Sequence, residues 1–334
     1  MSHVIVIAEA GVNHNGDVAR AKEMIDRARE AGADVVKFQT AVLEQMMTGQ
    51  ARMAGYAIDA VGVEESQFDM CRKFNFPLEV FAELREYAEG SSIQFLSTPF
   101  DLLSIDALHT IGIRLWKIAS GEITNFPFLR KIGRLREPVI LSTGMCSLGE
   151  VEAAIEVLTR FGTPRPGITL LQCNTDYPTA FEDVNLYGMV TLGEAFKLPF
   201  GYSDHTQGVE ASLAAVALGA RVIEKHFTLD RNLPGPDHKA SLEPGELAEL
   251  VRGVRNIEAA LGSGIKLPNL RESNNRSIAR KIIVAAREIV EGEIFSEDNL
   301  AAKRAGEGIS PMRWEELIGR KAARNFKQDE PIWI

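Results

Sequence analysis

Charged side chains sit within or just after several short apolar segments of this 334-residue chain. They are Glu9, Lys37, Lys117, Glu122 and Glu224. A buried lysine needs an anionic partner, so one interpretation is a structural ion-pair network with the glutamates. The other, which we favour, is a pocket whose lysines bind a carboxylate or phosphate. The neutral donors available to such a pocket are Ser120, Asn174 and Ser203.

Two histidines, His205 and His226, end successive apolar segments and can meet at one cation. Glu9 or Glu224 would then serve as a further ligand or as a hydrogen-bond partner. Two imidazoles with oxygen ligands suit a catalytic divalent ion such as Mn²⁺, Fe²⁺ or Zn²⁺. A hydrogen-bonded structural histidine or a general base remains the alternative for each ring.

Eight apolar, β-branched runs must position these residues, and amphipathic helical patterns separate them. The predicted strands are 4–10, 34–40, 93–99, 114–120, 138–144, 168–174, 199–204 and 221–227. Eight strand–helix units over roughly 260 residues predict an α/β fold of the TIM barrel type, with a doubly wound open sheet as the alternative. The carboxyl ends of barrel strands share one mouth, where we expect the polar residues to converge. Residues two apart share a face, so His205 should point with Ser203, and His226 with Glu224.

Composition divides the chain into a predicted barrel at 1–262, a Gly-, Pro-, Asn- and Ser-rich linker at 263–279 and a small unit at 280–334. The last unit has short strands and turns, and is too small to be more than marginally stable alone. The segment 41–76 has weak periodicity and should be a functional loop or carry short helices. In 11–17, Asp17 or Asn15 should cap the following helix, and His14 is interpreted as structural.

The bulk composition is that of an ordinary globular protein, with 45% hydrophobic and 25% charged residues. A net charge of −9 argues against nucleic-acid partners and against polybasic membrane binding. Three scattered cysteines predict neither a disulfide framework nor a thiolate metal site. We therefore expect a cytoplasmic protein without a signal peptide or membrane span.

Longer motifs carry a family resemblance along essentially the whole chain. They read IAEAGVNHNGD, VVKFQT, LSTPFD, WKIASGEITN, ILSTGM, QCNTDYPT, FEDVNL, GYSDHT, IEKHFT, GPDHKASLEP, KRAGEGISPM and LIGRKA. In this order they resemble the bacterial sialic acid synthase family. The resemblance implies a TIM barrel followed by an antifreeze-like (SAF) domain, in a domain-swapped homodimer. It also implies condensation of phosphoenolpyruvate with an N-acyl amino sugar, with release of phosphate.

The resemblance also implies a role for each matching residue. His205 and His226 would hold a divalent metal, Mn²⁺ first, with Mg²⁺ or Co²⁺ as alternatives. Glu9 and Glu224 would handle water and protons. The phosphoenolpyruvate ligands would be Lys37, Thr98, Lys117, Ser120 and Ser203, with Asn174 and Thr175 near the phosphate. The sugar site would be lined by Gln39, Phe100, Glu122, Tyr177 and Asp237, and Arg304 would enter from the partner subunit.

Two departures from the family pattern lie at the sugar end. Many members have an asparagine in the segment that here spans 56–61, and the tail reads Arg304-Ala-Gly-Glu-Gly308 where R-P-G-N-G is usual. The expected reaction is N-acetylneuraminate synthesis from N-acetylmannosamine. The alternative is legionaminate synthesis from 2,4-diacetamido-2,4,6-trideoxymannose. Two further hypotheses are a non-catalytic sugar- or phosphate-binding barrel and an aldolase with Lys37 or Lys117 as a Schiff-base nucleophile.

Overall fold

The computed structural model describes residues 3–53, 55, 58 and 66–334. The chain divides into two compact units, Met1–Ser263 and Gly264–Ile334. Each unit has its own hydrophobic core.

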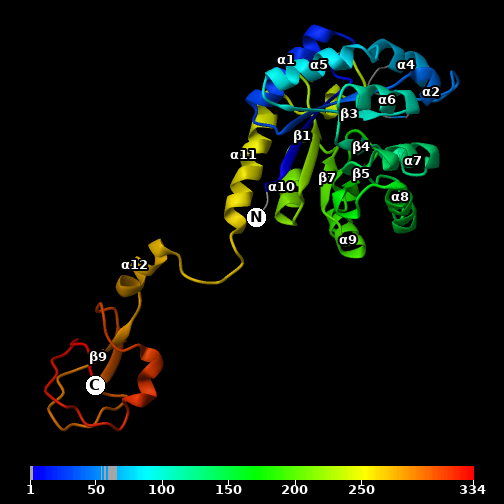
Figure 1. Cartoon of the computed structure of the whole chain (residues 1–334). Coiled ribbons are helices and arrows are strands. Elements are labelled where there is room, and N and C mark those ends of the chain that lie inside the picture. Colours follow the sequence, from blue (N-terminus) through cyan, green and yellow to red (C-terminus); the bar gives the residue numbers. More distant parts are fainter. Residues whose placement is uncertain (1–2, 54, 56–57, 59–65) are drawn as a thin grey trace. The chain divides into compact units, whose positions relative to one another are not determined.

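Eight parallel strands build the first unit (Figure 1). They are β1 (Ile5–Gly11), β2 (Val35–Thr40), β3 (Gln94–Pro99), β4 (Trp116–Ile118), β5 (Val139–Ser142), β6 (Ile168–Cys173), β7 (Phe200–Asp204) and β8 (Val222–His226). Their order in the sheet is β3-β2-β1-β8-β7-β6-β5-β4. The end strands β3 and β4 come within 8 Å of each other, so the sheet nearly closes on itself. The TIM barrel prediction is confirmed over the open-sheet alternative.

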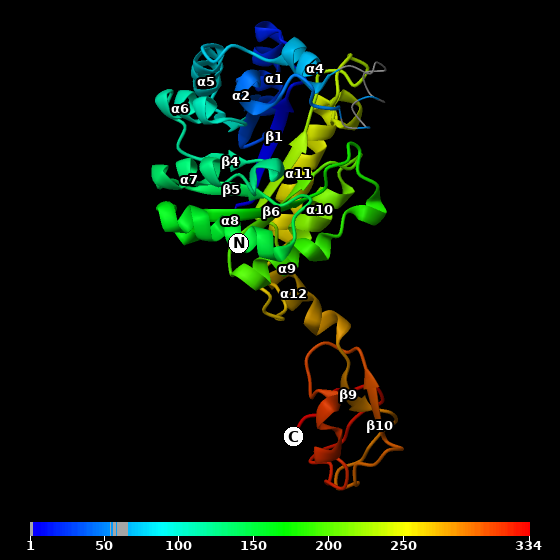
Figure 2. The same cartoon turned by 90° about the vertical axis from the view of Figure 1, so that its right-hand side faces the viewer.

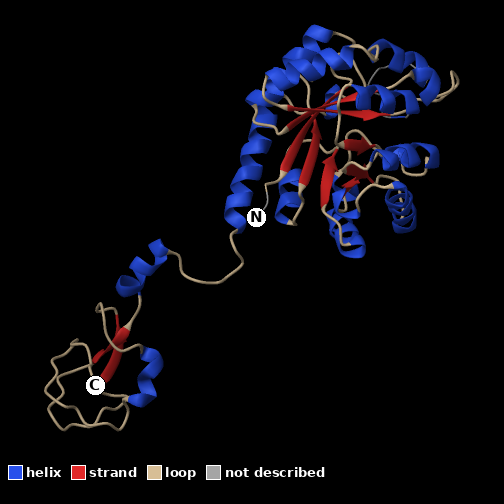
Figure 3. Ribbon diagram, in the orientation of Figure 1, coloured by secondary structure: helices blue, strands red, loops and turns tan. Residues whose placement is uncertain are grey.

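Helices cover the outside of this sheet, as the views in Figures 2 and 3 show. They are α1 (Val18–Glu30), α5 (Val80–Gly90), α6 (Leu102–Thr110), α7 (Phe126–Leu135), α8 (Leu148–Phe161), α9 (Leu186–Phe196), α10 (Glu210–Ala217) and α11 (Pro244–Leu261). Asp17 caps α1, as predicted, because its carboxylate accepts hydrogen bonds from the Ala19 and Arg20 amides. Among the residues that the structure describes, no helix combines the length and apolar content that crossing a membrane requires.

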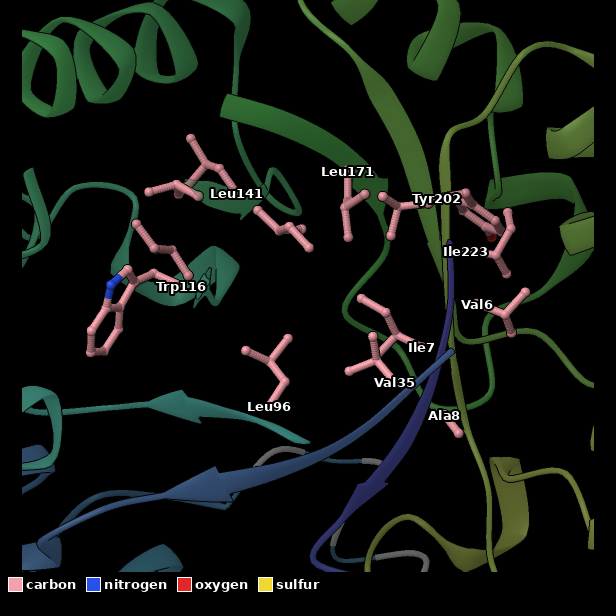
Figure 4. Close-up of a cluster of buried hydrophobic side chains, with 14 of the residues drawn as sticks. Val6, Ile7, Ala8, Val35, Leu96, Trp116, Leu141, Leu171, Tyr202 and Ile223 are labelled. Carbon is pink, nitrogen blue, oxygen red and sulfur yellow. The ribbon is translucent and has the colours of Figure 1, made fainter. Parts of the chain in front are cut away.

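The core fills the barrel interior and the layer between strands and helices (Figure 4). Trp116 and Tyr202 are fully buried there, on β4 and β7. Parallel strands that are buried on both faces consist of continuous apolar runs, and for this reason the sequence predicts their positions. Polar side chains interrupt these runs at the carboxyl ends, where the barrel opens.

The 41–76 segment carries short helices, as expected. Those among its described residues include α2 (Leu43–Met46) and α4 (Gln67–Phe74), which contact each other. Ser66 caps α4 by accepting a hydrogen bond from the Asp69 amide.

The second unit contains α12 (Leu270–Ala279), β9 (Ile282–Ala285) and β10 (Leu300–Lys303), and its two strands pair antiparallel. The helix lies in the segment that the sequence predicts to be a linker, and the composition of that segment did not indicate a helix. The physical reason is a capping box: the Asn269 side chain accepts from the Glu272 amide, and Glu272 accepts from the Asn269 amide. None of the α12 side chains is buried.

His14 is a buried histidine whose protonation should limit stability in acid. Its ring stacks on Phe76 with centroids 4.0 Å apart, and its Nδ1 accepts a hydrogen bond from the Gly16 amide. Burial lowers the pKa of His14 to about 3. Between that value and the unfolded value of about 6.5, the unfolded chain binds more protons, so stability is complete above pH 6.5 and falls as the pH falls.

We therefore expect His14→Phe, which keeps an aromatic ring but cannot titrate, to make the free energy of unfolding less dependent on pH below neutrality. The free energy of unfolding in urea, measured at pH 7 and pH 5, should fall less in the variant than in the parent. The slope attributable to His14 is at most about 1.4 kcal/mol per pH unit. Equal losses in parent and variant would contradict the assignment.

Candidate active site

A cavity of about 420 Å³ opens at the carboxyl ends of the barrel strands. All but two of the residues that the sequence singles out line it. They are Glu9, Lys37, Gln39, Thr98, Phe100, Lys117, Ser120, Asn174, Thr175, Tyr177, Ser203, His205, Glu224, His226 and Asp237. The i, i+2 pairs that were expected to share a face do so: the end of β7 contributes Ser203 and His205 to this cavity, and β8 contributes Glu224 and His226. Lys37 and Gln39 on β2 line it as well.

The floor of the cavity is a cluster of two lysines and two glutamates, each at least 95% buried. Lys37 Nζ lies 2.8 Å from Glu9 Oε2 and 3.7 Å from Glu224 Oε2. Lys117 Nζ lies 3.5 Å from Glu224 Oε1. Glu224 therefore stands between both ammonium groups, while Glu9 pairs with Lys37. Glu122, the third glutamate considered from the sequence, takes no part in this cluster.

Hydroxyl groups hold the same lysines in place. Lys37 Nζ donates to Thr98 Oγ1 at 2.9 Å, and Lys117 Nζ donates to Ser142 Oγ at 2.7 Å. Ser142, the last residue of β5, was not singled out from the sequence. The next residue, Thr143, donates its hydroxyl to the Leu171 carbonyl and lies outside the cavity lining. The strand register could have indicated Ser142. Ile140 on β5 pairs with Lys117 on β4, and Ser142, two residues later, shares a face with Ile140.

The four charged groups titrate differently because their surroundings differ. Burial raises the pKa of Glu9 to about 7 against the opposing effect of Lys37. Burial also acts to raise the pKa of Glu224, but the attraction of Lys117 and Lys37 outweighs it and leaves the pKa lowered. Burial lowers the pKa of Lys117. At neutral pH the cluster thus contains one firmly ionised carboxylate, Glu224, and one carboxyl group able to exchange a proton, Glu9.

The two imidazoles converge on one side of the cavity. Their ring centroids lie 5.4 Å apart. His205 Nδ1 lies 2.6 Å from the Asn174 carbonyl oxygen, which can only accept, so this nitrogen carries the hydrogen and Nε2 keeps its lone pair. Burial lowers the pKa of His205 to about 4 and that of His226 well below its usual value. Both rings are therefore neutral at pH 7, which is the form that binds metals.

The histidine pair fits an open divalent metal site. His226 Nδ1 is buried without a hydrogen-bond partner in the described part of the chain, and Asp237 Oδ2 lies 3.7 Å away. No group of three or more His, Cys, Asp or Glu side chains in ligating arrangement occurs among the described residues. Two protein nitrogens would leave the remaining coordination positions to substrate or water.

The opposite faces of the same two strand ends hold a second, fully buried ion pair. Lys225 Nζ lies 3.0 Å from Asp204 Oδ2, and the two residues are neighbours in the β7–β8 register. Asp204 also accepts from the Thr206 amide and hydroxyl and from the Ser212 hydroxyl. The pair lies one residue before His205 and His226, so it joins the two strands that present the imidazoles.

Smaller polar contacts complete the rim. Tyr177 stacks on His205 with centroids 4.0 Å apart, and its hydroxyl lies 3.1 Å from His205 Nε2. Ser120 Oγ accepts from the Gly144 amide at 2.8 Å and lies 3.1 Å from Cys173 Sγ. A side chain at Gly144 would place its Cβ 2.9 Å from Ser120 Oγ, so a glycine is needed for this close approach.

Two predicted sugar-site residues stand apart from the cavity lining. Glu122 is half-buried in a 3₁₀ turn after β4, where its carboxylate accepts from Asn125 at 2.6 Å. Arg304 is exposed just after β10 in the second unit. The segment 56–61, where the family asparagine is missing, lies outside the described residues except for Ile58. The roles expected for these positions stay predictions.

The fold and cavity together define a (β/α)₈ barrel protein with two buried lysines at the floor of its cavity and a pair of histidines at the carboxyl mouth. Comparison with known families specifies this class further. Residues 24–266 match the NeuB family, and residues 280–332 match the SAF domain. The chain belongs to the NeuB family and carries a SAF domain at its C-terminal end.

Several of its relatives are legionaminic acid and sialic acid synthases. The N,N'-diacetyllegionaminic acid synthase of Campylobacter jejuni is 52% identical over 99% of both chains. The human N-acetylneuraminate-9-phosphate synthase is 38% identical, over 98% of this chain and 90% of that one. A crystal structure of the N-acetylneuraminic acid synthetase of Leptospira borgpetersenii superposes with a TM-score of 0.71 at 36% identity, covering 82% of this chain and 90% of that one. These relatives favour catalysis over the non-catalytic alternative.

Breaking the Asp204–Lys225 pair from one side should destabilise the barrel strongly. Asp204→Asn leaves a buried ammonium group without its counter-charge, so we expect a loss of about 3–5 kcal/mol in the free energy of unfolding. Adding Lys225→Met removes that charge and should recover much of the loss. Urea unfolding of the parent, the single variant and the double variant measures both effects.

The matched control is the surface pair in which Lys131 Nζ lies 2.6 Å from Asp106 Oδ2. Asp106→Asn should change stability by about 1 kcal/mol or less, because solvent screens an exposed pair. A loss at Asp204 no larger than at Asp106 would contradict the structural role of the buried pair.

Proposed function

We propose that this protein condenses phosphoenolpyruvate with 2,4-diacetamido-2,4,6-trideoxymannose, giving the nine-carbon 2-keto acid N,N'-diacetyllegionaminate and phosphate. The observation that carries the reaction type is the buried pair of lysines facing the cavity, Lys37 and Lys117. The choice of acceptor is supported by the 52% identity to a diacetyllegionaminic acid synthase, against 38% to the human N-acetylneuraminate-9-phosphate synthase. N-acetylmannosamine, the acceptor expected from the sequence, becomes the second candidate.

The lysine side of the cavity would bind phosphoenolpyruvate. Its phosphate and carboxylate require several positive or donor groups, and Lys37 and Lys117 supply two buried ammonium groups. Hydroxyls within the same lining include those of Thr98, Ser120, Ser142 and Ser203. Asn174 and Thr175 follow β6 directly, after Cys173, whose Sγ lies 3.1 Å from Ser120 Oγ, and they remain our candidates for the phosphate end.

The carboxyl groups would divide the charge and proton chemistry. As the enol carbon of phosphoenolpyruvate bonds to the aldehyde carbon of the open-chain sugar, positive charge develops on the phosphate-bearing carbon. The ionised Glu224 stabilises that charge. Water then adds to this carbon and gives one proton to Glu9, which passes it to the alkoxide formed from the aldehyde. The C–O bond to phosphate breaks, the remaining hydroxyl proton goes to the departing phosphate, and the ketone is left. Glu9 suits this role because its pKa is raised to about 7.

A divalent metal, with Mn²⁺ as the first candidate and Mg²⁺ or Co²⁺ as alternatives, would bind His205 and His226. The neutral rings and the unpartnered buried nitrogen of His226 support this assignment. When bound, such a cation supplies Lewis acidity toward the aldehyde oxygen of the acceptor. Asp237, whose pKa is raised to about 6 by burial, faces His226 and would contact the acceptor or orient the ring.

The acceptor is tested by product analysis. We expect mass spectrometry to detect diacetyllegionaminate and an equal amount of phosphate when the protein, Mn²⁺, phosphoenolpyruvate and the diacetamido sugar are combined. N-acetylmannosamine should react with a kcat/KM at least about tenfold lower, since one missing apolar contact has that effect. A chelator should abolish turnover, and added Mn²⁺ should restore it. Efficient turnover of N-acetylmannosamine alone would overturn the choice of acceptor.

We also propose that the protein works as a homodimer. The start of the second unit exposes the apolar side chains of Ile265, Leu267, Leu270 and Ile278, with Leu270 88% exposed. Exposed apolar side chains concentrated in one short segment are typical of a surface covered by another chain. Light scattering after size exclusion should give twice the chain mass, and Leu270→Glu with Ile278→Glu should shift the protein toward monomer. A monomeric parent would contradict the proposal.

A further inference from the structure

One wall of the cavity is apolar and takes no part in the charge cluster. Helix α4 contributes Gln67, Met70, Cys71 and Phe74 to the lining, which are positions i, i+3, i+4 and i+7 of one helical face. Three of these four side chains are apolar or only weakly polar. Met70 is buried, and the other three are half-buried.

Helix α2 extends this wall with Leu43 and Met46, again on one face at i, i+3. Figures 1 and 2 both show α2 and α4 next to each other, in agreement with their contact. The Asn75 side chain donates to the Ala41 carbonyl at 3.0 Å, and this links the end of α4 to the start of α2. The wall is therefore one connected surface, which we call the α2–α4 wall.

The chemistry of the two substrates indicates which of them contacts this wall. Phosphoenolpyruvate is small and carries a phosphate and a carboxylate, and the lysines and hydroxyls of the strand ends match these groups. Apolar side chains do not stabilise anionic groups, so the α2–α4 wall is left to contact the sugar. Methyl groups are the parts of an N-acylated deoxy sugar that gain from leaving water. N-acetylmannosamine carries hydroxyls at C4 and C6. The diacetamido sugar has an acetamido group on C4, and its C6 is a methyl group.

We infer that the α2–α4 wall is the specificity surface for the acceptor, receiving its methyl-bearing edge and so selecting 6-deoxy, multiply N-acylated sugars. The inference rests on the proposed function and adds the residues that make the selection: Met46, Met70 and Phe74. These act by contact with bound sugar, without touching the reacting atoms at the floor of the cavity.

The test compares two acceptors that differ in one group, 2,4-diacetamido-2,4,6-trideoxymannose and its counterpart with a hydroxyl on C6. We expect the parent to prefer the 6-deoxy sugar in kcat/KM by about tenfold or more, as for one apolar contact in a pocket. Met46→Gln and Met70→Gln, which keep side-chain length and add an amide, should reduce that preference severalfold. The KM for phosphoenolpyruvate should stay within about twofold of the parent value.

Arg72→Ala is the matched control, since Arg72 is exposed on α4 and lies outside the cavity lining. It should leave the preference unchanged. Met46 is half-buried, so Met46→Gln tests the wall even if the buried Met70→Gln fails to fold. A preference that survives in Met46→Gln overturns the inference.

Failure of the proposed function gives a different result. If the parent turns over neither diacetamido sugar, that function is wrong, and the wall is then judged by calorimetric Kd values for the same two sugars. Tighter binding of the 6-deoxy sugar, lost in Met46→Gln, supports the wall without the reaction. Equal Kd values in parent and variant overturn the wall as well.

Discussion

The barrel mouth depends on the mutual neutralisation of two ammonium groups and two carboxyl groups away from water. None of the four could be buried alone, because desolvating an unpaired charge is more unfavourable than folding can tolerate. Glu224 stands 3.5 Å from Lys117 and 3.7 Å from Lys37, so it neutralises both in part. A dianionic ligand would therefore enter a site whose cations are already in position, and this preorganisation is what such a pocket needs.

The strand periodicity lets the same residues serve the site and the fold. Alternate side chains point to opposite faces, so β7 directs Ser203 and His205 to the cavity and Asp204 outward, and β8 does the same around Lys225. The outward pair is sealed under helices, where Ser212 of α10 donates to Asp204. Charged side chains are therefore paired on both faces of the two strand ends that carry His205 and His226.

Much of this site was predictable because strand geometry is rigid. Once eight strands are placed, the carboxyl-end residues and their i, i+2 partners must meet, and the lining confirms it for Lys37, Gln39, Glu224 and His226. Ser142 was missed because the end of β5 could not be placed to the exact residue from the sequence: the strand ends at Ser142, which lines the cavity. The helix after Asn269 was missed because a capping box outweighed a composition typical of loops.

The α2–α4 wall could not be predicted from the same rules, because it is not built from barrel strands. The lysine–glutamate cluster is built from strand positions, which the barrel register fixes to within a residue. The wall is built from short helices in a long βα connection, whose geometry depends on local caps such as Ser66. Connections of this kind can change without disturbing the strands. On our proposal, a barrel arranged in this way keeps one phosphoenolpyruvate chemistry while the connection after β2 determines which sugar is accepted.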